Sequence, residues 1–200
     1  MNNIKICLFD ADGVLTLPEE FFTQFYARSR GLDPSGFEAF FKNEFPAARV
    51  GQADLKELIA KNPALWQWEG TIDELLKLWF KTEDVRNEPL IMAIQNIRSL
   101  GIPCFVATNQ EQYRAQYMQE TMFKDEFDGY FVSALLGLEK PNVTFYEAVL
   151  SHLQTTMPEL KPENVLFVDD SEKNVSSAES VGMQVVQYRD VSQVSGLFLP

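Results

Sequence analysis

Four short polar segments of the chain combine residue types that can carry out phosphoryl transfer. They are Asp10-Ala11-Asp12-Gly13, Thr108-Asn109, Glu139-Lys140-Pro141 and Asp169-Asp170-Ser171. Carboxylate oxygens are hard ligands that suit Mg²⁺, and an Asp carboxylate can attack phosphorus to form an aspartyl-phosphate. A hydroxyl, backbone amides at the start of a helix and a Lys ammonium can bind phosphate oxygens. Phosphoryl transfer depends mainly on positioning and charge stabilisation, so these groups suffice if the fold brings them together.

The polar segments follow apolar runs that have the composition of buried strands. Five such runs occur, at residues 4–9, 102–108, 129–134, 164–169 and 183–188. Their continuous apolarity is typical of a parallel sheet covered on both faces. Helical patterns fill the intervals, at residues 89–100, 110–123, 172–181 and from Pro141 onward. This alternation predicts an α/β fold with a doubly wound, Rossmann-like, mostly parallel sheet, which binds ligands at the carboxyl ends of its strands.

Residues 17–86 interrupt this alternation with a segment that reads as helical throughout. Aromatic residues mark two helices, at residues 21–26 and 34–41, and a third helix follows Gly51. The fourth is TIDELLKLWF (71–80), where Thr71 and Glu74 have the spacing of a capping box. We expect the aromatic residues to form a small helical core. The predicted organisation is a core domain of residues 1–16 and 87–200 with an inserted α-helical cap domain of residues 17–86.

The composition excludes several classes of protein. With 17 Lys and Arg against 29 Asp and Glu, the net charge is −12, which opposes attraction to nucleic acid or anionic lipid. No apolar stretch is long enough to span a membrane, and the N-terminal apolar run is too short for a secretory signal. The two Cys residues lack metal-ligand spacing, which favours a reduced cytoplasmic protein without a zinc site. The sequence leaves open whether the chain is a monomer or a dimer.

Each polar segment alone has an ordinary structural explanation, but the four together resemble a known set of motifs. The segments are FDADGVL (9–15), ATN (107–109), LEKPN (138–142) and FVDDSEKNV (167–175). In this order and spacing they resemble the haloacid dehalogenase-like (HAD) hydrolase superfamily, in particular members with a small helical cap after the first strand. Asn142 stands where that family often has an acid, a change at the start of a helix from which we expect little consequence.

The resemblance implies a role for the acids of the first and last motifs. Asp10 would be the nucleophile and a Mg²⁺ ligand. Asp12 would be the general acid and base, with its main-chain carbonyl on the metal. Asp170 would bind Mg²⁺ directly, and Asp169 directly or through water. Asn174 would help to fix that loop, although it could also be a helix-surface residue.

The two middle motifs would bind the phosphoryl group. The resemblance implies that Thr108 and the amide of Asn109 bind its oxygens. Lys140 would bridge the nucleophile and the phosphate, the alternative being a solvated Lys before a Pro.

The function that these residues predict is a Mg²⁺-dependent phosphatase acting on a small phosphorylated metabolite through an aspartyl-phosphate. A phosphomutase of the same family, using the same catalytic residues, is the main alternative. A dehalogenase needs neither Asp12 nor the metal acids, and a receiver-type module does not explain the helical insert. A non-catalytic HAD-like binding protein is a further alternative, although every expected catalytic position is occupied. Substrate choice is expected to lie in the cap, where Glu19, Glu20, Phe22 and Arg49 are candidates to face the site. Arg49 is the candidate for recognition of a phosphorylated ligand, unless it is a solvated surface residue.

Overall fold

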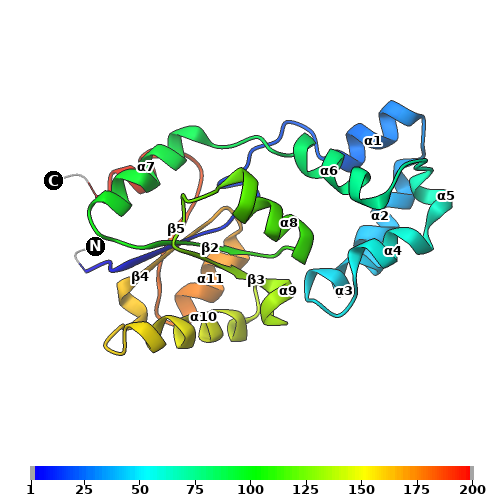
Figure 1. Cartoon of the computed structure of the whole chain (residues 1–200). Helices are drawn as coiled ribbons and strands as arrows, with labels where there is room; N and C mark the ends of the chain where they lie inside the picture. The colour runs from blue at the N-terminus through cyan, green and yellow to red at the C-terminus, as the bar shows by residue number, and fades with distance from the viewer. Residues whose placement is uncertain (1–2, 199–200) are drawn as a thin grey trace.

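The computed structural model describes residues 3–198 and contains one sheet of five strands. All neighbouring strands are parallel, in the order β3-β2-β1-β4-β5. The strands are β1 (Ile6–Phe9), β2 (Cys104–Thr108), β3 (Gly129–Val132), β4 (Val165–Asp169) and β5 (Gln184–Gln187). The predicted α/β fold with a parallel, Rossmann-like sheet is confirmed (Figure 1).

Each strand falls within a predicted apolar run, but the expectation for residues 129–134 is wrong at its C-terminal end. There Ser133 begins a short helix, α9 (Ser133–Leu136). The Ser133 hydroxyl donates to the carbonyl oxygens of Arg49 and Gln110, at 2.6 and 3.3 Å. The chain leaves the sheet at Ser133 because these contacts tie it to the inserted helices and to the loop after β2.

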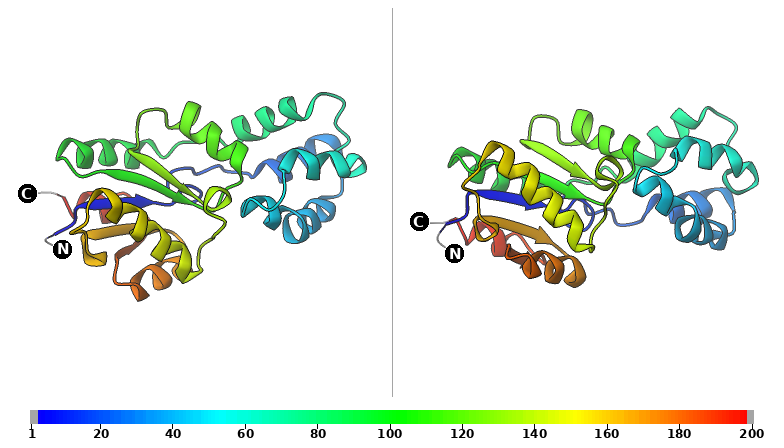
Figure 2. Two further views of the ribbon diagram at one scale, coloured as in Figure 1. Left: turned by 60° about the horizontal axis from the view of Figure 1, so that its bottom comes forward. Right: turned by 90° about the horizontal axis from the view of Figure 1, so that it is seen from below.

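Helices cover both faces of the sheet (Figures 1 and 2). One face carries α7 (Glu88–Ser99), α8 (Gln112–Tyr117) with the π-helical turn η1 (Met118–Met122), and α12 (Ser192–Ser195). The other face carries α10 (Val143–Thr156) and α11 (Glu172–Ser180), and the 3₁₀ turn η2 (Pro162–Asn164) precedes β4. Among residues 3–198, none of these or the remaining helices combines the length and the apolarity that crossing a bilayer requires.

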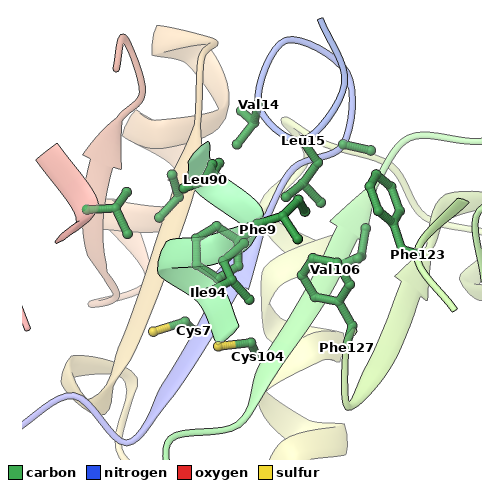
Figure 3. Packing of buried hydrophobic residues seen from close by; sticks show 14 of the residues in the cluster. Cys7, Phe9, Val14, Leu15, Leu90, Ile94, Cys104, Val106, Phe123 and Phe127 are labelled. Atoms are coloured by element: carbon green, nitrogen blue, oxygen red, sulfur yellow. The ribbon is translucent and has the colours of Figure 1, made fainter. Parts of the chain in front are cut away.

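The two-sided cover explains why the strands are apolar throughout. Successive strand residues point to opposite faces, so Phe9 packs against Leu90 and Ile94 of α7, while Leu8 belongs to the cluster on the α10 face. Figure 3 shows the first of these clusters, with Phe9 next to Leu90 and Ile94 of the helix. A rigid core on both faces holds the strand ends in place, and these ends carry the polar segments.

The residues between β1 and α7 form a separate group of helices beside the sheet (Figure 1). They are α1 (Phe22–Arg30), α2 (Pro34–Asn43), α3 (Phe45–Arg49), α4 (Leu55–Lys61), α5 (Pro63–Trp66) and α6 (Ile72–Thr82). Four of them match the predicted helices, and α6 begins with the predicted capping box. The helices α3 and α5 were not predicted, because five and four residues are too few to show a helical period.

The inserted helices pack around aromatic side chains of their own, as expected. Trp66 is 1% exposed, and its ring centroid lies 5.2 Å from that of Phe37 and 5.5 Å from that of Phe40. Tyr26 closes the cluster by donating its hydroxyl to the Trp66 carbonyl at 2.6 Å. This group therefore has a core that is distinct from the two clusters on the sheet.

Two extended connections join the inserted helices to the sheet and run side by side. The amide of Leu17 donates to the Val85 carbonyl, and the amide of Asn87 donates to the Leu15 carbonyl, both at 2.8 Å. The side chain of Asn87 is buried and donates to the Val14 carbonyl at 2.7 Å. Both connections thus pass the segment that follows β1, which carries Asp10 and Asp12.

Candidate active site

The predicted site residues stand where three neighbouring strands end. Asp10 directly follows β1, Thr108 is the last residue of β2, and Asp169 is the last residue of β4. Because all strands are parallel, these ends share one edge of the sheet. Lys140 reaches the same edge from the loop between α9 and α10. The structure thus brings all four polar segments together.

The ammonium of Lys140 lies between two carboxylates. Its Nζ is 2.8 Å from Asp10 Oδ1 and 2.7 Å from Asp169 Oδ2, and its side chain is 1% exposed. Burial lowers the pKa of Lys140, but the two carboxylates outweigh burial and raise this pKa above its ordinary value. Burial raises the pKa of Asp10 to about 7, although Lys140 acts in the opposite direction. A solvated Lys140 is excluded, and the site keeps an excess of negative charge.

Asn174 holds the carboxylate of Asp169. Its Nδ2 lies 3.0 Å from both oxygens of Asp169, and the amide of Ser171 donates to Oδ1 at 2.9 Å. The hydroxyl of Tyr146 in turn donates to the Asn174 carbonyl at 2.9 Å. Asn174 therefore faces the site rather than solvent, which fits a loop-positioning role.

Three carboxylates lie close enough to hold one cation. Oxygens of Asp10, Asp169 and Asp170 fall within 4.8 Å of one another. Gly13 has a φ of 82°, and a Cβ at this position would stand 2.8 Å from Asp170 Cγ, so glycine lets the Asp170 carboxylate approach. Asp10 Oδ2 makes no hydrogen bond or ion pair with the described residues. This donor set fits a hard divalent cation such as Mg²⁺.

The side chain of Asn109 joins the loops that carry Thr108 and Lys140. Its Nδ2 donates to the Lys140 carbonyl at 2.8 Å, and the Lys140 amide donates to its Oδ1 at 2.9 Å. Thr108 is buried beside it, with 1% exposure. The Asn109 side chain is thus engaged within the protein, and the predicted role of its backbone amide in binding a phosphoryl oxygen stays a prediction.

Asp12 accepts hydrogen bonds on both carboxylate oxygens. Oδ1 accepts from Thr16 Oγ1 at 2.9 Å and from the guanidinium of Arg114 at 2.7 Å, and Oδ2 accepts from Gln110 Nε2. The Asp12 side chain is 35% exposed, whereas that of Arg114 is 7% exposed. These three contacts fix the orientation of the Asp12 carboxylate.

A buried ion pair extends from Asp12 into the inserted helices. Arg114 also lies 2.7 Å from Oε2 of Glu83, and Glu83 Oε1 accepts from the amide of Phe22 at 2.8 Å. Burial raises the pKa of Glu83, although Arg114 lowers it. Sequence reasoning missed Gln110, Glu83 and Arg114. Nothing in the sequence marks them, because long polar and charged side chains are usually solvated, and only tertiary packing buries these three.

A sequence model of haloacid dehalogenase-like hydrolases matches residues 4–182. The chain belongs to this hydrolase family. The match includes all four motifs and the whole helical insert, so it agrees with the resemblance drawn from the motifs.

Two curated relatives match this hydrolase over only part of their own length. Sesquiterpene phosphatase astK of Aspergillus oryzae is 35% identical over 91 residues, which cover 45% of this chain and 44% of that protein. Bifunctional epoxide hydrolase 2 of Sus scrofa is 24% identical over 218 residues, which cover 94% of this chain and 37% of that protein. The chain thus spans less than half the length of these relatives.

A solved structure of similar size shares the fold of this hydrolase. It is a HAD family enzyme, bt-2542, of Bacteroides thetaiotaomicron in complex with magnesium and inorganic phosphate. The TM-score is 0.77 at 19% sequence identity, and the comparison covers 98% of this chain and 100% of that chain. The agreement over both whole chains includes the helical insert as well as the sheet.

The cap residues proposed from the sequence have mixed positions in this hydrolase. Arg49 is not a freely solvated side chain, because its Nε lies 2.7 Å from Oε2 of Glu139, which precedes the buried Lys140. Glu20 pairs with Arg28 at the surface. The expectation that Phe22 faces the site is wrong, since its side chain is fully buried in the aromatic cluster of the insert.

A cavity of about 250 Å³ lies between the inserted helices and the sheet edge of this hydrolase. Asp12, Asn109 and Gln110 line its polar end, and Arg49 and the Arg114–Glu83 pair also border it. The rest of the lining consists of Thr23, Glu111 and five aromatic residues: Phe21, Phe41, Phe45, Trp79 and Phe80. A molecule in this cavity would touch the carboxylate of Asp12.

Proposed function

We propose that this hydrolase is a Mg²⁺-dependent phosphatase that cleaves a small phosphorylated metabolite through an aspartyl-phosphate on Asp10. The observation that carries the proposal is the environment of Asp10. Its Oδ1 faces Lys140 Nζ at 2.8 Å, its Oδ2 has no partner among the described residues, and its carboxylate lies close to those of Asp169 and Asp170. Carboxylates this close together, two of them buried, are costly unless cations compensate them. The relationship to a sesquiterpene phosphatase supports the reaction type.

Magnesium is part of the proposal because the donor set suits it. Asp10, Asp169 and Asp170, with the main-chain carbonyl of Asp12, would hold the ion. When bound there, it would neutralise charge on the phosphoryl oxygens. The HAD family enzyme bt-2542, which shares the fold, was crystallised with magnesium and inorganic phosphate.

In the first half of the reaction, Asp10 Oδ2 attacks phosphorus and the ester P–O bond breaks. The leaving oxygen takes the bonding electron pair and a proton from Asp12. Thr108, the amide of Asn109 and the ammonium of Lys140 hold the phosphoryl oxygens in place. Since positioning supplies much of the rate in phosphoryl transfer, the buried and hydrogen-bonded state of these groups is itself catalytic.

Asp12 carries the transferred proton on Oδ2. A carboxylate oxygen has two lone pairs, and Oδ1 already accepts from Thr16 and Arg114. Oδ2 accepts only from Gln110 among the described residues, so one of its lone pairs remains for a proton. In the second half of the reaction the ionised Asp12 removes a proton from water, which attacks phosphorus and releases inorganic phosphate and free Asp10.

The inserted helices act in this proposal as a cap domain of residues 17–86 on a core of residues 1–16 and 87–200. The paired connections at Leu15–Leu17 and Val85–Asn87 support these boundaries, because the chain crosses between the two parts only there. Movement of the cap about these connections would admit substrate and then exclude water. A cytoplasmic setting is also part of the proposal, since Cys7 and Cys104 lie opposite each other on neighbouring strands and are free thiols.

The test is release of inorganic phosphate from an aryl phosphate with Mg²⁺ and with a chelator. We expect release only with Mg²⁺. Rapid quenching followed by borohydride reduction should convert position 10 to homoserine, the product of a reduced aspartyl-phosphate. Lack of phosphate release, or an unmodified Asp10 during turnover, would refute the proposal. If the protein instead isomerises a sugar phosphate without net release of inorganic phosphate, it is a phosphomutase.

A further inference from the structure

We propose that the cavity beside Asp12 binds the leaving group of the substrate, and that this leaving group is an apolar alcohol. The inference rests on the proposed phosphatase function and names the substrate class of that same site. Asp12 would protonate the leaving oxygen, so the alcohol must lie next to the Asp12 carboxylate. The space there is the cavity, whose lining includes Asp12 itself.

The wall opposite Asp12 is built from aromatic rings that support one another. The ring centroid of Phe41 lies 4.7 Å from that of Phe45 and 5.5 Å from that of Trp79. Phe45 and Trp79 belong to the buried core of the insert, with exposures of 9% and 4%. Because these rings are held by packing, they present a preformed apolar surface to a ligand, which lowers the entropic cost of binding.

Most of the polar side chains around the cavity are already engaged within the protein. Glu83 and Arg114 pair with each other, and Arg49 pairs with Glu139. Glu111 accepts from the amides of Tyr113 and Arg114 at the start of α8.

The two amide side chains nearest to Asp12 are engaged as well. Gln110 bonds to Asp12, and Asn109 bonds to the backbone of Lys140. Among the described residues, two buried donors next to the cavity lack partners, Trp79 Nε1 and Arg114 Nε. A sugar would bury several hydroxyl groups against too few free partners, at a cost for each unsatisfied group. A hydrocarbon meets no such penalty.

Phe21 extends the aromatic wall to the mouth of the cavity. Its side chain is 53% exposed and it occupies the N-cap position of α1 without capping the helix. Phe is a poor N-cap, where Ser is favoured, so helix formation does not explain its presence. Contact with an apolar ligand explains the presence of Phe21 at this position. At about 250 Å³ the cavity is slightly smaller than typical small-molecule sites, so the leaving group is compact rather than a long chain.

The test compares two phosphates of similar shape, cyclohexylmethyl phosphate and glucose 6-phosphate, with acetyl phosphate as a reference that has little leaving-group surface. With Mg²⁺ present, we expect kcat/KM to be at least about tenfold higher for cyclohexylmethyl phosphate than for glucose 6-phosphate. Cyclohexylmethanol should also inhibit competitively at concentrations where glucose does not. Equal or reversed preference for glucose 6-phosphate would overturn the inference.

A variant pair assigns the preference to the cavity. Phe21→Ser introduces a favoured N-cap residue and should leave the fold intact, as thermal unfolding will show. It should raise KM for cyclohexylmethyl phosphate about tenfold and change that for glucose 6-phosphate much less. Met92→Ser is the matched control, because Met92 is 63% exposed on α7 and lies outside the cavity. An unchanged KM in Phe21→Ser would overturn the placement of the leaving group.

The failure of this inference differs from the failure of the proposed function. Without phosphatase activity, none of the three phosphates would release inorganic phosphate. If only the substrate class is wrong, acetyl phosphate and glucose 6-phosphate are hydrolysed and the apolar phosphate has no advantage. Calorimetry with Asp10→Asn protein and the two larger phosphates gives a readout that is independent of turnover, and tighter binding of the apolar one is expected.

Discussion

The two walls of the cavity are built in different ways. On the core side, Lys140 is paired with Asp10 and Asp169, and Asp12 is paired with Arg114. On the cap wall aromatic side chains predominate, and four of them, Phe41, Phe45, Trp79 and Phe80, pack in one cluster. Phosphoryl transfer needs charged groups at fixed positions, and the strand ends provide these positions. Selection of an apolar leaving group needs an apolar surface, and the packed aromatic rings provide this surface. We therefore propose that the core carries out the reaction and that the cap selects the substrate.

The largest expected effect comes from removing the nucleophile of the core wall. Asp10→Asn should lower kcat by at least about 10³-fold, because an amide cannot form the phosphate ester. The fold should survive, since Lys140 keeps Asp169 as a partner. Steady-state phosphate release measures the change in kcat, and circular dichroism shows whether the fold is kept. Asp125→Asn makes the same chemical change at an exposed residue far from the site and is the control. Near-normal turnover in Asp10→Asn would place the reaction elsewhere.

The next effect concerns the cation. Asp170→Ala should raise the Mg²⁺ concentration for half-maximal activity by at least about tenfold, since even changes around metal ligands cost about 10–100-fold in affinity. In the unaltered protein Mg²⁺ should raise Tm, because a ligand of the native state stabilises it, and Asp170→Ala should lose most of this increase. Thermal unfolding with and without Mg²⁺ measures the effect without turnover. The same titration curve in both proteins would remove Asp170 from the metal site.

A smaller effect should appear where the two walls meet. Glu83→Gln leaves the buried guanidinium of Arg114 with Asp12 as its only carboxylate, and should lower the free energy of unfolding by about 3 kcal/mol. Arg114→Met should cost a similar amount and also lower kcat, since Asp12 loses a donor that positions it. Denaturant unfolding of both variants and of the double variant gives the coupling energy. Additive costs would show that the walls are independent.

The smallest effect is a pH dependence from Glu111, which is 2% exposed on the core wall. Burial raises the pKa of Glu111 from 4.5 to about 7. Between these values the folded protein keeps a proton that the unfolded chain has released, so this group makes stability fall as pH rises. Between pH 4.5 and 7 the free energy of unfolding falls by at most about 3 kcal/mol through this group. Glu111→Gln cannot titrate, so its stability relative to the unaltered protein should increase from pH 4.5 to 7. A constant difference would contradict the buried, protonated state.

The core wall could be predicted from the sequence and the cap wall could not. Strand ends are visible because an apolar run stops at a polar residue, which located Asp10, Thr108 and Asp169. The end of β3 was misplaced because Ser133 bonds to Arg49 and Gln110, which are far away in the sequence. Phe21 and Phe22 are adjacent and chemically identical, yet Phe22 is fully buried in the insert and Phe21 borders the cavity. Only the packing of α1 distinguishes them.

The sequence by itself determined the order of strands and helices, the helical nature of the insert and the set of acids at the sheet edge. Each of these depends on local patterns, such as apolar runs, caps and the residue that follows a strand. The tertiary structure decided that Arg114 pairs with both Glu83 and Asp12, that Asn109 bonds to the backbone of Lys140, and that aromatic rings line a cavity with Asp12. These contacts join residues that are distant in the chain, and their geometry exists only once the insert lies against the core.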